Sequence, residues 1–343
     1  MVVSHERTIM RLSRPTFTLV LAGAAAAAAL GALSLPLLGH HLASTFHVLT
    51  DASRPWLFGS FVAFLGAFAC TVGAWRSALS AAGARLCPKQ AAARLGIGSM
   101  VNAFTPAKLG DAVKITLCAR AIDAPDRMWT ATGTYTALAA ARSLTLAGLV
   151  VVASATHALP IWPVFLLVGS AAVVALIAVA STRFRSHHRI ASFLAGVSAL
   201  AKDRRALRGV ALWTIGMQLF RLAGTVAAVY AFGLPHPLLA ALVILPALDL
   251  AGAVPLTPGS FGIGGGAVAV ALASRGIGMT DALATGLAIQ GVETVVSVTC
   301  GSLGLAYLMQ PSERVTRAAV RIAVVGASAV LAALVGVFVI DLF

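Results

Sequence analysis

The side chains best suited to chemistry cluster in one short segment of this chain. The sequence contains one asparagine and four lysines, and Asn102, Lys108 and Lys114 lie in this segment together with Asp111. Charges inside apolar helices are costly and mark a functional site by default. Asn102 and Lys108 offer hydrogen-bond donors to an anion such as phosphate. In the alternative interpretation, Lys108 pairs with Asp111 one helical turn away, and Lys114 extends to the membrane surface.

Two turns share the pattern T-P-x-x-[L/F]-G, at residues 105–110 and 257–262. Thr is a favourable N-cap and Pro is favoured at the first helical position, so Thr105 and Thr257 are each predicted to begin a half-helix. The free N–H groups and the dipole at such an end attract anions. Two ends that meet would therefore form a seat for a phosphate-like group, whereas the alternative is a proline kink in an ordinary packed helix. The predicted substrate-binding residues are Asn102, Thr105, Pro106, Lys108, Gly110, Asp111, Thr257, Pro258, Gly259 and Gly262.

Four further charges, Arg142, Arg221, Asp249 and Glu293, lie within apolar stretches. Arg142 and Glu293 occupy nearly equivalent places, 37 and 36 residues after the Thr of the first and the second turn. We predict that these four residues form a gate or charge relay, with Arg142 and Glu293 as a candidate ion pair, although each could instead clamp two helices together. No catalytic triad, carboxylate pair or metal-ligand spacing is apparent, so we expect no enzyme, metal or cofactor.

The elements that position these residues are membrane-spanning helices. Hydrophobic residues make up 59% of the 343 residues and charged residues only 10%, and the mean hydropathy is +0.93. A soluble domain carries about 25% charged residues, so this composition excludes a soluble protein. We predict an all-α, polytopic transmembrane helical bundle with about seven full spans. Apolar stretches long enough to cross a bilayer occupy residues 17–38, 56–76, 128–155, 160–182, 209–232, 281–309 and 321–342.

The charge pattern predicts a cytoplasmic N-terminus. With that orientation the cytoplasmic segments hold 19 of the 25 Lys and Arg residues and the opposite side holds two, in agreement with the positive-inside rule. Two more apolar stretches, 88–119 and 238–276, are each interrupted by a Thr-Pro turn, and both ends of each come out on one side. The turns carry no charge between residues 103 and 107 or between 255 and 259, so we favour re-entrant loops over full hairpins.

The order of spans around the two turns predicts an inverted repeat within a single integral membrane domain. Each turn follows one span and precedes two, and the two units begin on opposite sides of the membrane. Paired broken helices in inverted repeats indicate a binding site near the midplane. The predicted parts are an extra N-terminal span and external loop (1–55), a first repeat unit (56–182), a basic cytoplasmic loop (183–208) and an inverted second unit (209–343).

Three sequence segments resemble the lysylphosphatidylglycerol synthase transmembrane-region family, also called flippase-like membrane proteins. They read Trp75-Arg76-Ser-Ala-Leu, Asn102-Ala-Phe-Thr-Pro-Ala-Lys-Leu-Gly-Asp111 and Pro255-Leu-Thr-Pro-Gly-Ser-Phe-Gly-Ile-Gly264. The resemblance covers about residues 56–310 and implies movement of aminoacylated phosphatidylglycerol, or of hopanoid or polyprenyl lipids, between leaflets. The chain departs from the family pattern at Ala107-Lys108 and Gly265, which affects the expected substrate, and it ends without a soluble aminoacyltransferase domain, so we do not expect it to make the lipid.

The function expected from these features is a flippase-like transporter of an anionic lipid in the cell inner (plasma) membrane. The expected partners are lipids with anionic headgroups, and the absence of a basic patch interleaved with aromatics argues against nucleic acid. A second hypothesis is an ion-coupled small-solute transporter that uses Arg142, Asp249 and Glu293. A third is a non-transporting scaffold for a lipid-modifying enzyme, with a lipid-synthesis enzyme or glycosyltransferase as its partner.

Overall fold

The computed structural model describes residues 48–49, 51–84, 86–105, 109–124, 126–156, 188–253 and 261–308, and every element in these ranges is a helix. Four of the described helices are long and apolar enough to cross a membrane: α2 (Arg54–Ala81), α5 (Arg127–Ala155), α8 (Arg204–Ala231) and α11 (Met279–Leu308). The protein is therefore a multi-pass helical membrane protein. The other three predicted spans, 17–38, 160–182 and 321–342, lie outside the described residues.

Shorter helices occupy the two interrupted stretches. The first stretch contains α3 (Pro88–Phe104) and α4 (Leu109–Ala119), and the second contains α9 (Pro237–Ala253) and α10 (Phe261–Ala273). Each is shorter than the ~20 residues that a crossing requires. One more helix, α7 (His188–Lys202), lies in the basic segment before α8.

Local sequence explains where the long helices begin and end. Pro55 stands at the start of α2, where a missing N–H costs nothing. Asp203 caps α8, since its carboxylate accepts hydrogen bonds from the backbone N–H groups of Arg205 (2.9 Å) and Ala206 (3.1 Å). After α8 the chain turns at Gly233, whose φ of +63° lies in the left-handed region that favours glycine.

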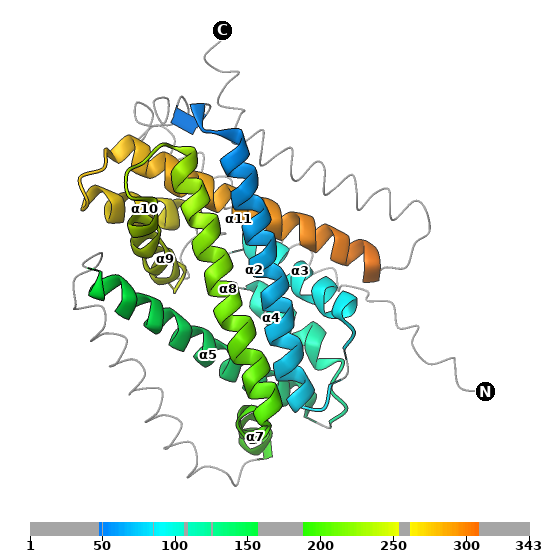
Figure 1. Cartoon of the computed structure of the whole chain (residues 1–343). Helices are drawn as coiled ribbons and strands as arrows, with labels where there is room; N and C mark the ends of the chain where they lie inside the picture. The colour runs from blue at the N-terminus through cyan, green and yellow to red at the C-terminus, as the bar shows by residue number, and fades with distance from the viewer. Residues whose placement is uncertain are drawn as a thin grey trace.

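Helices α2 and α8 pack against each other along their whole length in opposite directions (Figure 1). At one end the Ser53 N–H donates to the Ala231 carbonyl (2.8 Å). At the other end a side chain added at Gly209 would meet Ser77, and in between Gly66 and Gly73 accept the rings of Phe220 and Trp213. The glycines allow close approach of the two backbones. This antiparallel pair forms the centre of the described bundle.

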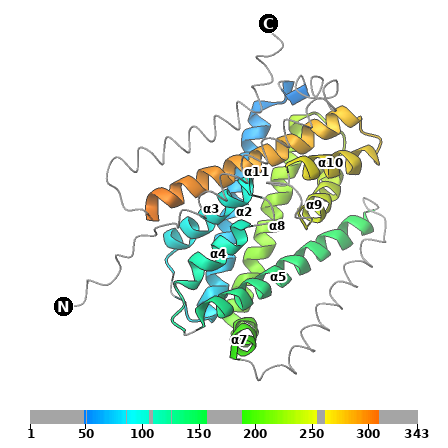
Figure 2. The ribbon, with the colours of Figure 1, turned by 180° about the vertical axis from the view of Figure 1, so that it is seen from behind.

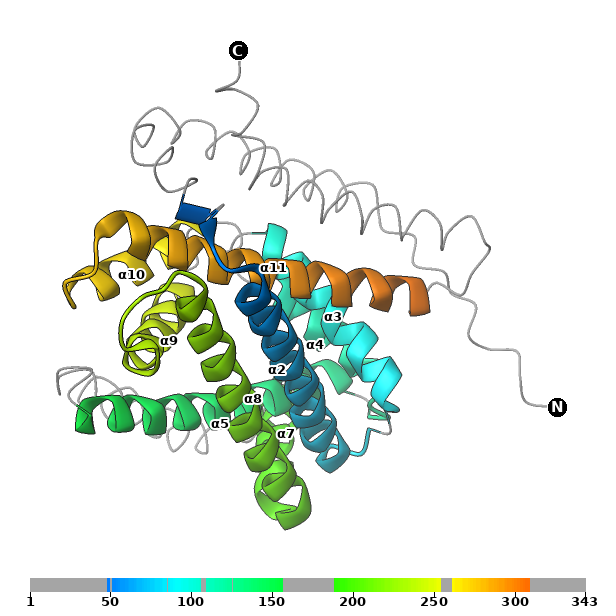
Figure 3. The ribbon, with the colours of Figure 1, turned by 45° about the horizontal axis from the view of Figure 1, so that its top comes forward.

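Helix α11 packs against one helix of each short pair. Its C-terminal half packs on α3, where Gly301 and Gly304 lie against Met100 and Ala93, and its N-terminal half packs on α10. Figures 1 and 3 show α3 and α4 on one side of the α2–α8 pair and α9 and α10 on the other, while α11 crosses between them. The view from behind in Figure 2 shows α11 running past both short pairs. The two interrupted stretches are thus joined through one long helix.

Helix α5 crosses the bundle on the same side as α11 (Figure 2). Near its start it packs tightly on α7, because Gly133 of α5 and Gly196 of α7 each lie against the backbone of the other helix. The buried core next to this contact includes Trp75, Leu79 and Leu138. This packing fixes α5 so that Tyr135 faces α4, which is the starting point for the site described next.

Candidate functional site

Asp111 is the centre of a polar cluster that joins three helices. Its Oδ1 accepts hydrogen bonds from Asn102 Nδ2 of α3 (2.9 Å) and Lys114 Nζ of α4 (3.0 Å), and its Oδ2 accepts one from the Tyr135 hydroxyl of α5 (2.8 Å). The Asp111 and Lys114 side chains are 21% and 16% exposed, so this is a largely buried ion pair. We call Asn102, Asp111, Lys114 and Tyr135 the Asp111 cluster.

The cluster brings Asn102 against Asp111 and tests one of the two sequence alternatives, the one for Lys114. The two sequence alternatives paired Asp111 with Lys108 and let Lys114 extend to the membrane surface. Lys114 instead turns inward to Asp111, as residues three apart on one helix face can do. Lys108 and Pro106 lie outside the described residues, so their predicted roles stay predictions.

Tyr135 is a member of the cluster that the sequence reasoning missed. It lies 24 residues after Asp111, on a different helix. One signal was present, since Tyr135 is one of three tyrosines in the chain and stands within an apolar span. A phenol buried in such a span needs a hydrogen-bond partner. Its ring also packs against Trp75 of α2, with centroids 5.7 Å apart.

Thr105 ends α3. Its hydroxyl donates to the Val101 carbonyl (2.7 Å) and its N–H donates to the same carbonyl (3.0 Å). The backbone at Thr105 is extended, with φ −115° and ψ 143°, as expected for a residue before proline. Residues 106–108 lie outside the described residues, so the predicted role of Thr105 at the start of a half-helix stays a prediction. In the described part of α4 (Leu109–Ala119), Asp111 places a negative charge in the first turn.

Gly110 provides the space that the Asp111 cluster needs. A Cβ atom built on Gly110 would lie 2.5 Å from Asn102 Oδ1, so any larger residue would displace the amide. Asn102 Oδ1 is itself buried and has no hydrogen-bond partner among the described residues. The predicted residues Asn102, Gly110 and Asp111 therefore form one contact region between α3 and α4.

Arg221 is the centre of a second polar cluster, built from the second half of the chain. Its Nη1 donates to Asp249 Oδ2 of α9 (2.9 Å) and to Gln218 Oε1 (3.4 Å), and its Nε lies 4.0 Å from Glu293 Oε1 of α11. Arg221 is 12% exposed, Asp249 25% and Glu293 37%. We call Gln218, Arg221, Asp249 and Glu293 the Arg221 cluster. Three of the four charges predicted to act as a gate or relay are thus in contact.

The fourth predicted charge, Arg142, does not form the expected ion pair with Glu293. Among the described residues the counter-charge of Glu293 within 4 Å is Arg221, because α8 packs beside α9 and α11. Arg142 is exposed on α5 and has no salt bridge with a described carboxylate.

The second Thr-Pro turn cannot be placed beside the first. Thr257, Pro258 and Gly259 lie outside the described residues, and Gly262 is described only as part of α10. In the described part of the chain, no group of three or more His, Cys, Asp or Glu side chains could hold a metal ion.

The arrangement has a definite chemical capacity. Carboxylates and cations sit on helices that are otherwise apolar, and charged groups in such helices face a watery cavity or each other. Arg142 has no acidic partner within 4 Å in the described residues, so its charge is available to an external anion.

Comparison with known proteins agrees with this architecture. Among curated proteins, no sequence matches this chain. The chain does match the family described as the lysylphosphatidylglycerol synthase TM region, over residues 19–301, which include all the described helices up to most of α11. The match begins earlier in the chain than the segments that first suggested it and contains both polar clusters. This protein belongs to the lysylphosphatidylglycerol synthase transmembrane-region family.

Proposed function

We propose that this protein is a flippase-like transporter that moves an anionic lipid between the leaflets of the cell inner (plasma) membrane. The observation that carries the proposal is the presence of two polar clusters, one in each half of the chain, on helices that are otherwise apolar. A lipid phosphate that reached both clusters would meet polar groups from both halves of the chain at once. The family membership supports a membrane function of this kind.

The predicted inverted repeat gives the proposal its geometry. Helices α2, α3, α4 and α5 have 28, 17, 11 and 29 residues, and helices α8, α9, α10 and α11 have 28, 17, 13 and 30. The first helices of the two sets pair in opposite directions. These matches support two related units of inverted orientation, an architecture in which the substrate site lies between the units and access alternates.

The charges of the site suit an anion that enters and leaves. Lys114 and Arg221 are already neutralised by Asp111 and Asp249. Arg142 has no such partner within 4 Å in the described residues, so its charge is open to an incoming phosphate. In the proposal the headgroup phosphate engages Arg142, the Asn102 amide and Lys108, while the acyl chains stay in the lipid.

Reconstitution in liposomes tests the proposal. Fluorescent anionic lipids should redistribute between leaflets faster in proteoliposomes than in empty liposomes, and Arg142→Gln or Lys108→Ala should reduce the rate. Arg275→Gln is a matched control, because Arg275 is exposed after α10 and belongs to neither cluster. A wild-type rate equal to that of empty liposomes would exclude lipid transport. Rates equal to that of the wild type in both Arg142→Gln and Lys108→Ala would exclude the proposed site.

A second candidate function rests on the Arg221 cluster. Glu293 is 37% exposed although it lies in a span, and a carboxylate in that position can carry a proton in an ion-coupled solute transporter. Solute uptake coupled to a pH change, without any lipid movement, would favour this function over the first.

The proposed orientation places α7 and the basic loop in the cytoplasm and the turn after α10 outside. The support is the excess of Lys and Arg in the segments on the side of α7. Lys202 and Arg275 are exposed. Arg275→Cys should react with an impermeant thiol reagent in intact cells, whereas Lys202→Cys should react only after the cells are permeabilised. The unsubstituted protein corrects for labelling of Cys87, which is exposed. Labelling of both variants from one side would contradict the orientation.

A further inference from the structure

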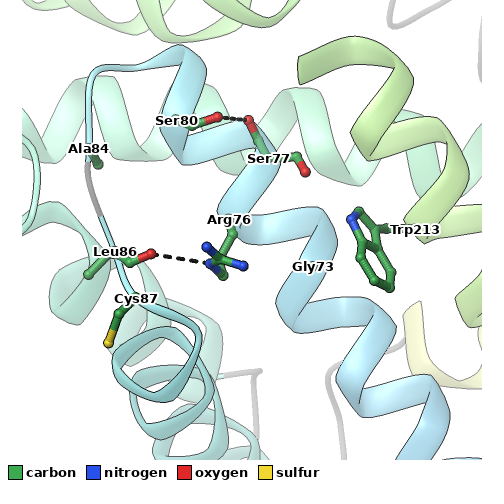
Figure 4. Close-up of a pocket in the computed structure, with 8 residues that line it drawn as sticks. All are labelled: Gly73, Arg76, Ser77, Ser80, Ala84, Leu86, Cys87 and Trp213. Atoms are coloured by element: carbon green, nitrogen blue, oxygen red, sulfur yellow. Dashed lines mark hydrogen bonds between the residues drawn. The ribbon is translucent and has the colours of Figure 1, made fainter. Parts of the chain in front are cut away.

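A cavity of about 490 Å³ is lined by none of the residues of the two polar clusters, and Figure 4 shows the residues that do line it. It opens between the last turns of α2, the connection to α3 and the first half of α8. We call it the Arg76 cavity. The residues that line it are Gly73, Arg76, Ser77, Ser80, Ala84, Leu86, Cys87 and Trp213. Binding pockets for small molecules range from about 300 to 1,000 Å³, so the cavity can hold a headgroup-sized ligand.

Arg76 is oriented by one hydrogen bond through its Nε, and its terminal N–H groups remain available as donors. Its Nε donates to the Leu86 carbonyl (3.2 Å), which orients the guanidinium. Figure 4 shows the guanidinium between the connection to α3 and the ring of Trp213. Among the described residues no carboxylate lies within 4 Å of Arg76. Its two terminal amino groups can therefore bind an anion in the planar, bidentate manner typical of Arg and phosphate.

Ser77 adds a neutral donor beside Arg76. The Ser80 hydroxyl is already engaged, because it donates to the Ser77 carbonyl (2.8 Å). The Ser77 side chain packs against Gly209 of α8, where a Cβ atom would lie only 2.7 Å from its Oγ, so Gly209 allows the hydroxyl its place at the cavity. One guanidinium and a hydroxyl on adjacent residues of one helix end provide the charge and the hydrogen bonds that a phosphate requires.

The surroundings of the cavity fit a lipid. Trp213 is 45% exposed and Leu212 is 71% exposed, so α8 presents an apolar surface beside the cavity that suits acyl chains. Trp and Arg concentrate at the level of the headgroups, and the segment that contains Arg76 is predicted to be cytoplasmic. A phosphate bound at Arg76 would thus leave its acyl chains along the apolar surface of α8.

The Arg76 cavity is separate from the site of the proposed function. Trp75, the neighbour of Arg76, is 2% exposed and packs on Tyr135 of the Asp111 cluster. Adjacent helical residues point about 100° apart, so the cavity and the Asp111 cluster lie on different faces of α2. We propose that the Arg76 cavity is a phosphate-binding site at the cytoplasmic membrane surface, occupied by the phosphodiester of an anionic phospholipid or by free phosphate.

Native mass spectrometry of the delipidated full-length protein tests this proposal. The probes are phosphatidylglycerol, diacylglycerol of the same chain length, and inorganic phosphate. Binding of phosphatidylglycerol but not of diacylglycerol, with about tenfold weaker affinity in Arg76→Gln, would support a lipid phosphate in the cavity. If phosphatidylglycerol fails to bind and inorganic phosphate binds to wild type but not to Arg76→Gln, free phosphate is the ligand.

Matched variants keep the test interpretable. Arg120→Gln removes one positive charge from an exposed position after α4, outside the cavity, and should leave affinity unchanged. If Arg76→Gln does not elute as a monodisperse protein, Arg76→Lys and Ser77→Ala replace it. Both should weaken binding, because Lys lacks the bidentate fork and Ala lacks the hydroxyl. Equal binding of diacylglycerol and phosphatidylglycerol without phosphate binding, or equal affinities in wild type and all cavity variants, would overturn the proposal.

Discussion

Replacing Asp111 by Asn would remove the one negative charge that holds three helices together through Asn102, Lys114 and Tyr135. Asn keeps the size and one acceptor oxygen, but the Lys114 ammonium loses its counter-charge while it stays 16% exposed. Removing one partner of a buried ion pair costs about 3–5 kcal/mol, and the partial exposure of Asp111 favours the lower end. For domains of 150–250 residues, 1 kcal/mol shifts the Tm by about 2–4 °C, so for this longer chain we expect a decrease of roughly 5 °C.

A double-mutant cycle separates this mechanism from simple damage. Thermal unfolding in detergent, followed by helical circular dichroism, would compare Asp111→Asn, Lys114→Met and the double variant. The double variant should be more stable than Asp111→Asn, because no charge is then left unpaired. Asp123→Asn is the control for the loss of a carboxylate, since Asp123 is exposed in the connection after α4.

Two outcomes would refute the reasoning. An unchanged Tm for Asp111→Asn would mean that Lys114 finds water or another partner without cost. Additive losses in the double variant would mean that Asp111 and Lys114 do not stabilise the fold through each other. Either result would remove the Asp111 cluster as the element that positions Asn102.

Further predictions concern the packing on α11 and the Arg221 cluster. Gly96→Val should lower the Tm by a few degrees, since overpacking costs about 1–3 kcal/mol and a Cβ at Gly96 meets the Cys300 backbone. Gly148→Ala, where a Cβ meets nothing within 4 Å, should leave the Tm unchanged or raise it. Arg221→Met should lower the Tm and abolish transport because two carboxylates lose their counter-charge, and adding Asp249→Asn should recover part of the Tm. A Tm for Gly96→Val equal to wild type, or no recovery in the double variant, would contradict these explanations.

The sequence predicts the helices well where apolar length decides the structure. Four predicted stretches appear as α2, α5, α8 and α11, because about 20 apolar residues leave a chain few alternatives to a span. Boundaries were less accurate, and α8 begins at Arg204, five residues before the predicted stretch at 209, because Asp203 supplies a cap. The interruption after Phe104 was also predictable, since Thr-Pro disfavours a continuous helix.

The choice of partners within the site was not predictable. Nearly equal distances from the two Thr-Pro turns suggested an Arg142–Glu293 pair, but pairing depends on how helices are rotated and packed against one another. Because α8 packs beside α9 and α11, Arg221 pairs with Asp249 and lies near Glu293. Tyr135 reaches Asp111 only because α5 crosses α4, a contact with no local signal in the sequence. The sequence therefore shows which helices carry the charged residues, but it does not show which residue on another helix each of them contacts.

The antiparallel pairing of α2 and α8 also sets the order in which the protein can assemble. Arg204 follows Ala81 by 123 residues, so the ribosome finishes α2 long before it begins α8. At roughly 5–20 residues per second this delay is about 6 to 25 s. Throughout this interval Gly66 and Gly73 are without the rings of Phe220 and Trp213 that pack on them in the finished fold. The emergence of α8 lets α2 reach its final packing, whereas α3 reaches its own only after α11 has followed.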